Sequence, residues 1–208
     1  MQNPVTQYPD LDIPEQRQEE PGLDSKLIPL ADHGEKTYVG AERLKGRKAL
    51  ITGADSGIGC AVAIAYAREG ADIALSYLPS EQADADEVIA LIEAEGRMAV
   101  AIPGDISDEA FSKQLVEEAA SKLGGIDILV NNAGRQLYVE KLEDLDADQF
   151  ESTFRTNVFA MFWITKAALK YLPAGASIIN TTSIQSYQPS PGLIDYASTK
   201  GAITAFTH

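Results

Sequence analysis

The sequence predicts a doubly wound α/β fold, in which helices cover both faces of a parallel sheet. From Leu44 onward, short apolar runs alternate with longer amphipathic stretches, a pattern typical of repeated βα units. Three of the amphipathic stretches are followed by Gly70, Gly96 and Gly124, at positions where a left-handed residue commonly ends a helix. Right-handed crossovers between parallel strands would place a ligand site at the carboxyl ends of the strands.

Strands and helices are expected to alternate along this part of the chain. Each short apolar run predicts a strand, and each amphipathic stretch predicts a helix. The strands are expected at 48–52, 72–77, 98–103, 126–131 and 177–181. The helices are expected at 57–69, 81–95, 108–123 and 147–172.

The composition is that of an ordinary globular domain. The chain has 208 residues, of which 45% are hydrophobic and 23% charged, enough for a sizeable core. Its net charge of −14 argues against nucleic acid or an anionic membrane as the main partner. No apolar run approaches the length of a membrane span, and the N-terminus lacks the order of a secretory signal. The single cysteine, Cys60, suits a reducing compartment, so we expect a cytoplasmic protein.

Residues 1–42 differ from the rest, and we expect them to form an extended N-terminal arm before a domain spanning 43–208. Five of the ten prolines fall in the arm among acidic residues, and no helical or strand period is recognisable there. One interpretation is an exposed acidic tail. The other is an arm that packs on a neighbouring subunit through its apolar residues. These are Tyr8, Leu11, Ile13, Leu27, Ile28 and Leu30.

A glycine-rich turn follows the first expected strand and precedes an alanine-rich helix. It reads Gly53-Ala54-Asp55-Ser56-Gly57-Ile58-Gly59. Glycines let the backbone turn sharply and let a pyrophosphate approach the main chain. The start of the helix offers unpaired N–H groups and a partial positive charge. The strand before and the helix after predict a nucleotide site, although glycines also serve any tight βα turn.

A tyrosine and a lysine near the end of the sequence carry possible acid–base chemistry. In Tyr196-x-x-x-Lys200 the two side chains share one face of a helix. A phenol with an ordinary pKa of about 10 is a poor acid or base at neutral pH, but an adjacent ammonium stabilises the phenolate. Tyr196 could then exchange a proton with a carbonyl or alcohol oxygen, to which Ser183 could hydrogen-bond. Taken alone, the pair is also common on helix surfaces.

Together these motifs resemble the classical short-chain dehydrogenase/reductase family, over about residues 45–208. Residues 52–59 resemble the cofactor turn Thr-Gly-x-x-x-Gly-Ile-Gly, and Ser183 precedes Tyr196-x-x-x-Lys200 in the order and spacing of that family. The resemblance implies a Rossmann-type sheet and hydride transfer between NAD or NADP and a small aldehyde, ketone or alcohol. The arm is similar to that of bacterial relatives resembling aldehyde reductases and glucose or ribitol dehydrogenases, which favours a small aldehyde or a polyol.

The resemblance also implies the site residues. A fourth catalytic position, Asn157, matches an asparagine that anchors a water joining the lysine to a proton relay, so the catalytic set is Asn157, Ser183, Tyr196 and Lys200. The implied cofactor-binding residues are Gly53, Asp55, Ser56, Gly57, Ile58, Gly59, Ser76, Tyr77, Asp105, Ile106, Asn132, Ala133, Gly134, Tyr196 and Lys200. The implied substrate residues are Ser183, Gln185 and Tyr196, in a pocket also lined by Arg135, Gln136, Ile184, Tyr187 and Asp195.

Two of these assignments have simpler structural alternatives. Asp105 corresponds to the family's adenine-contacting acid, but it could be a plain turn residue before a helix. The segment Asn131-Asn132-Ala133-Gly134 corresponds to the element that steadies the sheet and lines the cofactor, but its asparagines could simply cap a loop.

The end of the second strand bears on the choice of cofactor. An acid there bonds the ribose 2′-hydroxyl and repels a 2′-phosphate. The sequence Ala74-Leu75-Ser76-Tyr77-Leu78 contains no acid. The Arg or Lys that NADP-preferring relatives carry is also absent, because Ser56 and Leu78 occupy those positions. Ser76 could bond either group, so the sequence favours NADP only slightly and predicts some dual use.

The resemblance implies further strands and a substrate lid beyond residue 208. We therefore expect a piece of a longer enzyme, with a sheet truncated after the fifth strand and the start of the following helix. The fifth strand would then be an uncovered apolar edge. A homodimer or homotetramer is expected, formed through the helices of Asn157 and Tyr196. If the chain does end at 208, a non-catalytic NAD(P)-binding or assembly protein is the alternative. No metal is expected, because His33 and His208 lack partners at ligand spacing.

Overall fold

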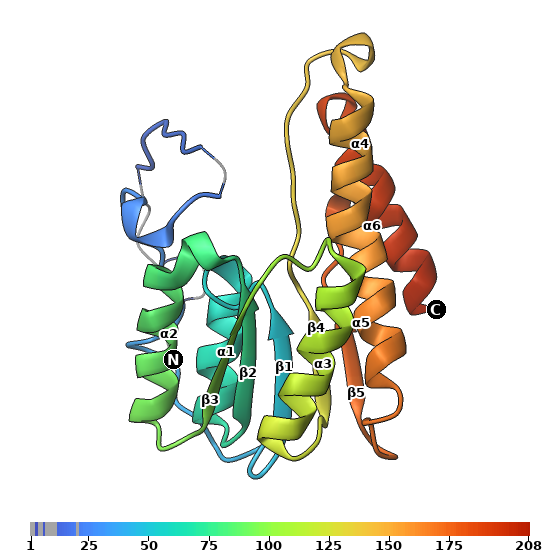
Figure 1. Cartoon of the computed structure of the whole chain (residues 1–208). Helices are drawn as coiled ribbons and strands as arrows, with labels where there is room; N and C mark the ends of the chain where they lie inside the picture. The colour runs from blue at the N-terminus through green and yellow to red at the C-terminus, as the bar shows by residue number, and fades with distance from the viewer. Residues whose placement is uncertain (1–2, 4–5, 7–11, 20) are drawn as a thin grey trace.

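Five parallel strands form one sheet in the order β3-β2-β1-β4-β5 (Figure 1). They are β1 (Lys48–Thr52), β2 (Asp72–Tyr77), β3 (Ala99–Pro103), β4 (Ile128–Asn131) and β5 (Ser177–Asn180). The computed structural model describes residues 3, 6, 12–19 and 21–208, so Tyr8 and Leu11 of the arm lie outside it. β1 is central, and the chain crosses from one side of it to the other between β3 and β4. Doubly wound sheets bind ligands where the strand order reverses in this way.

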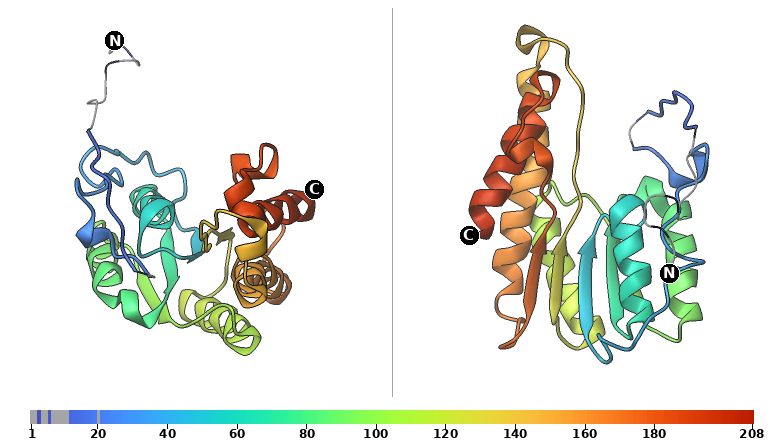
Figure 2. Two further views of the ribbon diagram at one scale, coloured as in Figure 1. Left: turned by 90° about the horizontal axis from the view of Figure 1, so that it is seen from above. Right: turned by 180° about the vertical axis from the view of Figure 1, so that it is seen from behind.

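Helices cover both faces of the sheet (Figure 2). The cluster on one face includes residues of α1 and α2, and that on the other includes residues of α3 and α5. α4 and α6 pack against each other. Their bounds are α1 (Gly57–Arg68), α2 (Gln82–Ala94), α3 (Glu109–Leu123), α4 (Ala147–Phe154), α5 (Ala160–Ala168) and α6 (Ile194–Thr207). Within the described part of the chain, no helix is long and apolar enough to span a bilayer. The predicted fold class is confirmed.

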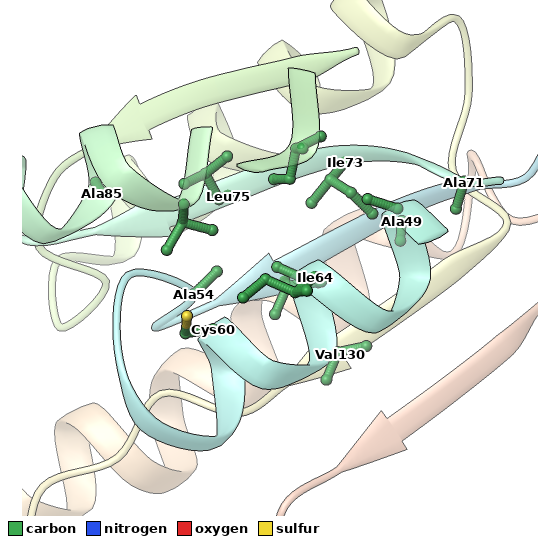
Figure 3. Close-up of a cluster of buried hydrophobic side chains, with 14 of the residues drawn as sticks. Ala49, Ala54, Cys60, Ile64, Ala71, Ile73, Leu75, Ala85 and Val130 are labelled. Carbon is green, nitrogen blue, oxygen red and sulfur yellow. The ribbon is translucent and has the colours of Figure 1, made fainter. Parts of the chain in front are cut away.

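Alternate residues of the central strands supply two hydrophobic cores. Ile51 belongs to the cluster beneath α1 and α2, and Leu50 belongs to the cluster beneath α3 and α5. Successive strand residues point to opposite faces, so a parallel sheet covered on both faces needs nearly continuous apolar strands. Figure 3 shows Cys60 in the first cluster, at the start of α1. Burial raises the pKa of the Cys60 thiol to about 12, so this cysteine is a core residue and not a nucleophile.

The predicted elements are confirmed to within a few residues, with one exception. The three expected helix-ending glycines have positive φ angles of 95° at Gly70, 69° at Gly96 and 74° at Gly124. The exception is the segment expected to be one helix over 147–172. Here the π-helical turn Arg155–Phe159 separates α4 from α5. A π turn often marks a functional position in a helix, and this one contains Asn157.

β5 lies at one edge of the sheet, with apolar side chains that are partly uncovered. Ile178 is 37% exposed and Ile179 is 41% exposed. Central strands such as β1 bury the same kind of residue almost completely. This agrees with the uncovered apolar edge that the sequence predicts for the fifth strand.

The described part of the arm packs against its own chain, which neither interpretation of the sequence anticipated. It lies beside α1 and α2 in Figure 1. The guanidinium of Arg68, at the end of α1, donates to the carbonyl oxygens of Gly34 at 3.0 Å, Glu35 at 2.6 Å and Tyr38 at 2.6 Å. Such bonds between a side chain and backbone leave no periodic pattern in a sequence, so an arm lacking any period can still be ordered.

A buried carboxylate holds the next part of the arm. Glu69 accepts hydrogen bonds from the amides of Ala41 at 3.0 Å and Arg43 at 2.9 Å, and from the hydroxyl of Tyr38. The Arg43 side chain bonds the same carboxylate, and this bond holds the pKa of Glu69 well below its usual range. The arm is therefore fixed along the C-terminal end of α1 by two neighbouring residues of opposite charge.

Replacing Arg68 with Met should lower the free energy of unfolding by about 2 kcal/mol, because three arm carbonyls lose a charged donor. The matched control is Arg47→Met, because the contact that the structure describes for the exposed Arg47 side chain is an ion pair with Asp127 at 3.4 Å. That variant should cost no more than about 1 kcal/mol. Urea unfolding of both variants measures the difference. Equal losses would show that Arg68 does not anchor the arm.

Candidate active site

The glycine-rich turn joins β1 to α1 at the carboxyl end of the central strand. A Cβ at Gly59 would lie 1.8 Å from the carbonyl oxygen of Gly53, so only glycine fits there. Gly57 has a φ of 52°, and a Cβ built on it would meet nothing within 4 Å. The first amides of α1 have no carbonyl partner inside the helix. The Gly57 amide donates to Oδ2 of Asp24 at 3.2 Å, so the amides that follow it are the ones that can face a ligand. Open space beside such N–H groups is what a phosphate group requires, so the turn fits the pyrophosphate of a dinucleotide.

Substituting Gly59 with Ala should therefore cost about 3 kcal/mol of unfolding free energy and abolish nucleotide binding, because the new methyl group would clash with backbone. Gly201→Ala is the control, since a Cβ at this α6 position meets nothing within 4 Å. It should stabilise the protein by about 0.5–1 kcal/mol through helix propensity. Urea unfolding and calorimetric titration with 5′-AMP give the two readouts. Normal nucleotide binding by the Gly59 variant would contradict the assigned close contact.

The segment after β4 is hydrogen-bonded to this turn. The Thr52 hydroxyl oxygen accepts from the amides of Asn132 at 3.0 Å and Ala133 at 3.1 Å. The side-chain amide of Asn132 donates to the carbonyl oxygens of Thr52 at 3.3 Å and Gly53 at 3.1 Å. The hydroxyl of Thr181 donates to Oδ1 of Asn132 at 3.2 Å. These bonds join the carboxyl ends of β1, β4 and β5 into one surface.

Lys200 is buried at the same edge of the sheet. Its side chain extends from α6, and the residue is only 3% exposed. Nζ donates to the carbonyl oxygen of Thr181 at 2.7 Å and lies 5.3 Å from the ring centre of Tyr196. Burial lowers the pKa of Lys200 to about 8, because removal from water favours the neutral amine. At neutral pH a buried ammonium therefore faces the half-buried phenol.

The depressed pKa of Lys200 predicts how stability depends on pH. The folded value of about 8 is below the ordinary 10.5, so the folded protein loses this proton first and gains stability as the pH rises between those values. The unfolding free energy of the wild type, measured relative to Lys200→Met, should rise by up to about 3 kcal/mol across this window. Urea unfolding at several pH values provides the measurement. A difference that stays constant with pH would contradict the assigned burial.

Asn157 ties the segment after β4 to α6. It is 2% exposed in the π-helical turn. Its Oδ1 accepts from the amide of Arg135 at 2.7 Å, and its Nδ2 donates to the Arg135 carbonyl at 3.0 Å and to the Thr199 hydroxyl at 3.0 Å. Thr199 directly precedes Lys200, so Asn157 helps to place the lysine. Its role in a proton relay stays a prediction.

Ser183 follows β5 and caps the short 3₁₀ turn Ile184–Ser186. Its hydroxyl oxygen accepts from the amide of Gln185 at 3.2 Å, which leaves the hydroxyl proton for another acceptor. The 3₁₀ turn packs against α6, the helix that carries Tyr196 and Lys200. Three of the predicted catalytic residues therefore come from neighbouring elements at one end of the sheet.

Two predicted cofactor-binding side chains are buried inside the protein. Ser76 is 1% exposed, and its carbonyl oxygen accepts from the amide of Gly53 at 2.8 Å. Tyr77 is 3% exposed, and its hydroxyl donates to Gln82 at 3.0 Å. The structure corrects the expectation that these side chains face the cofactor, because β2 is covered on both faces.

Asp105 and Ile106 lie just past the end of β3. The Asp105 side chain accepts from the amide of Ser107 at 2.8 Å, and the residue is exposed. Ile106 is 8% exposed, in the core beneath α3 and α5. An exposed acid in a tight turn is compatible with adenine contact and with a purely structural role, so its binding role stays a prediction.

The residues expected to line the substrate pocket differ in how far they are exposed. Asp195 is 1% exposed and accepts from the hydroxyl of Thr153 at 2.8 Å and from the amide of Tyr196 at 2.8 Å. It therefore fixes the start of α6, and its place in a substrate pocket stays a prediction. Gln185 accepts from the amide of Ser190 at 2.6 Å. Of the expected pocket residues, Ile184 is 66% exposed, Tyr187 is 72% exposed, and Gln136 is exposed as well.

Several hydroxyl groups that organise the site were not predicted from the sequence. Thr52, Thr181 and Thr199 connect the turn, β5 and α6 through their side chains. The position of Thr52, directly before the first glycine of the turn, was the one available signal. The partners of Thr181 and Thr199 are distant in sequence, so no local pattern reveals them.

The fold is a doubly wound parallel sheet, and a glycine-rich turn and the pair of Tyr196 and Lys200 lie at the carboxyl ends of its strands. The model of the short chain dehydrogenase family matches residues 47–208. The chain is 58% identical over 205 residues to the uncharacterized oxidoreductase YhxD of Bacillus subtilis, covering 99% of this chain and 69% of the relative. It is 39% identical over 193 residues to the NADPH-dependent aldehyde reductase 1, chloroplastic, of Arabidopsis thaliana, covering 90% of this chain and 67% of that protein.

A solved structure shows the same similarity. The short chain dehydrogenase from Burkholderia cenocepacia J2315, in complex with NADP, has a TM-score of 0.76 and 40% sequence identity. The match covers 79% of this chain and 67% of that one. The chain belongs to the short-chain dehydrogenase family. The predicted enzyme class, an NAD(P)-dependent oxidoreductase of this family, is confirmed.

Proposed function

We propose that the protein transfers a hydride between NADP or NAD and a small aldehyde, ketone or alcohol, with Tyr196 as the acid and base. The observation that carries this proposal is the buried ammonium of Lys200, which lies 5.3 Å from the Tyr196 ring. The cofactors of similar proteins support it, since the Burkholderia structure contains NADP and the Arabidopsis reductase is NADPH-dependent.

Side chains of this protein transfer the proton to or from the substrate oxygen. A bound nicotinamide would supply the hydride to the carbonyl carbon in reduction or accept it in oxidation. Tyr196 gives its hydroxyl proton to the carbonyl oxygen during reduction and takes a proton from the alcohol during oxidation. Ser183 donates a hydrogen bond to the same oxygen and stabilises its developing charge. Lys200 stabilises the phenolate through its positive charge.

The cofactor would be held by backbone more than by side chains. The amides at the start of α1 receive the pyrophosphate, and the glycines of the turn leave room for it. The surface formed by the segment after β4 lies alongside this turn, because Asn132 is bonded to Gly53 at 3.1 Å. The further cofactor-contacting residues in the proposal are Asp55, Ser56, Asp105, Ala133 and Gly134.

The residues beyond Ser183 favour a small polar substrate. Gln185 and Tyr187 follow it on the 3₁₀ turn, and Tyr187 is 72% exposed. The similarity to an aldehyde reductase supports a small aldehyde, or the corresponding alcohol, as the substrate class. We also propose a homodimer or homotetramer. Phe159 and Phe162, beside Asn157 in sequence, are 41% and 45% exposed and are available for helix contacts between copies.

Tyr196→Phe should lower turnover by at least about 100-fold, because the general acid and base is lost. Binding of the reduced nucleotide, followed by its fluorescence, should change little. Tyr66→Phe is the control, since this residue of α1 packs against the hydrophobic cluster beneath α1 and α2 and takes no part in the proposed chemistry. Turnover is measured as loss of the reduced-nicotinamide absorbance with a panel of small aldehydes.

Unchanged turnover in Tyr196→Phe would rule out the proposed mechanism. If the unmodified protein binds the nucleotide but reduces no aldehyde, ketone or sugar of the panel, the non-catalytic binding interpretation prevails over the enzyme.

A further inference from the structure

The side chain of Asp24, in the N-terminal arm, contacts Gly57, which belongs to the glycine turn and is the first residue of α1. Its Oδ2 accepts from the amide of Gly57 at 3.2 Å. The same oxygen lies 2.8 Å from Nε2 of His33. The backbone amide of Asp24 donates to Oδ2 of Asp84 on α2 at 2.7 Å. The arm therefore places a carboxylate that is distant in sequence beside the turn, and contacts with Gly57, His33 and Asp84 fix its position.

This position is where dinucleotide-binding sheets place the adenine ribose. The ribose lies between the first βα turn and the end of the second strand, where an acid bonds the 2′-hydroxyl. Asp24 connects Gly57, at the start of α1, to Asp84, on the helix that follows β2. β2 itself ends in Ser76 and Tyr77, whose side chains are buried. The arm therefore contributes an acid at the place where β2 has none.

Further carboxyl groups lie close to this position. Asp55 of the turn is 3% exposed, and its Oδ2 has no hydrogen-bond partner among the described residues. Burial raises the pKa of Asp55, and the charges of Asp84 and Asp24 raise it further. Burial likewise raises the pKa of Glu81, with added effects from Asp55 and Asp84. The acids are thus close enough to interact, and a doubly charged phosphate group entering beside them would be repelled.

We propose that Asp24 is a specificity-determining residue, which discriminates against the 2′-phosphate of NADP and so makes the protein favour NAD. A neutral ribose hydroxyl can donate a hydrogen bond to the Asp24 carboxylate, whereas a phosphate at the same place cannot and also meets its charge. The inference rests on the proposed function, because it concerns the cofactor of that site. It reverses the slight preference for NADP that the sequence of β2 alone predicts.

Calorimetric titration of the full chain with two fragments, 5′-AMP and adenosine 2′,5′-bisphosphate, tests this directly. The fragments differ only in the 2′-phosphate. The wild type should bind 5′-AMP at least about tenfold more tightly than the bisphosphate. Asp24→Asn keeps an oxygen for the Gly57 amide but removes the charge. It should strengthen bisphosphate binding about tenfold and change 5′-AMP binding by less than about twofold.

The matched control is Asp32→Asn. Asp32 is an exposed arm acid whose Oδ1 accepts from the Gly34 amide at 2.8 Å, so its replacement removes an equal charge away from the turn. It should leave the affinity ratio of the two fragments unchanged. The same ratio in Asp24→Asn and Asp32→Asn would overturn the proposal.

Other outcomes separate this inference from the proposed function. Wild-type protein that binds the bisphosphate as tightly as 5′-AMP overturns the inference alone, and this measurement does not depend on the folding of any variant. An equal increase in the affinity of Asp24→Asn for both fragments would also overturn the inference, because the arm would then compete with any nucleotide. Failure of the wild type to bind either fragment would overturn the proposed function and, with it, the inference.

Discussion

The candidate site depends on one buried charge, the ammonium of Lys200. Removing a charge from water is costly unless a partner is present, and here the Thr181 carbonyl oxygen supplies one at 2.7 Å. The cost is visible in the pKa of Lys200, which burial lowers to about 8. The charge is retained at neutral pH, one helical turn from Tyr196, where it can stabilise a phenolate. Burial of this charge costs stability, as is common in active sites, and this cost supports the proposed role of Lys200.

The geometry around Lys200 is maintained by hydroxyl and amide side chains, and not by apolar packing alone. The hydroxyl oxygen of Thr52 accepts hydrogen bonds from two backbone amides of the segment after β4. The side chain of Asn157 is hydrogen-bonded both to that segment and to Thr199 on α6. These bonds join elements that are distant in the sequence. The glycine turn and the helix of the tyrosine and lysine are therefore connected through the segment after β4 by hydrogen bonds, which supports the proposal that they form one site.

Much of the fold could be predicted because parallel strands covered on both faces must be apolar at nearly every position. Leu50 and Ile51 of β1 show this, since adjacent residues enter different cores. Glycines that end helices, such as Gly124, were predictable because only a residue without a Cβ takes a positive φ easily. The glycine turn and the pair of Tyr196 and Lys200 could be recognised for a different reason, because each motif is defined by residues close together in the sequence.

The remaining features depend on contacts between distant residues. The π-helical turn interrupts a segment whose apolar period favours one helix, and Asn157 within it bonds distant groups. Ser76 was expected at the site, yet the covering of β2 on both faces buries it. The arm has no period, so the contact between Asp24 and Gly57 could not be predicted. In each case tertiary packing decided the outcome, and local sequence carried no signal of it.

The most direct test of the proposed site is a crystal structure of the protein with an oxidised nicotinamide dinucleotide bound. We expect the pyrophosphate at the amides that begin α1 and the nicotinamide ring beside the Tyr196 hydroxyl. A dinucleotide bound away from the glycine turn, or with its nicotinamide directed away from Tyr196, would contradict the proposed function.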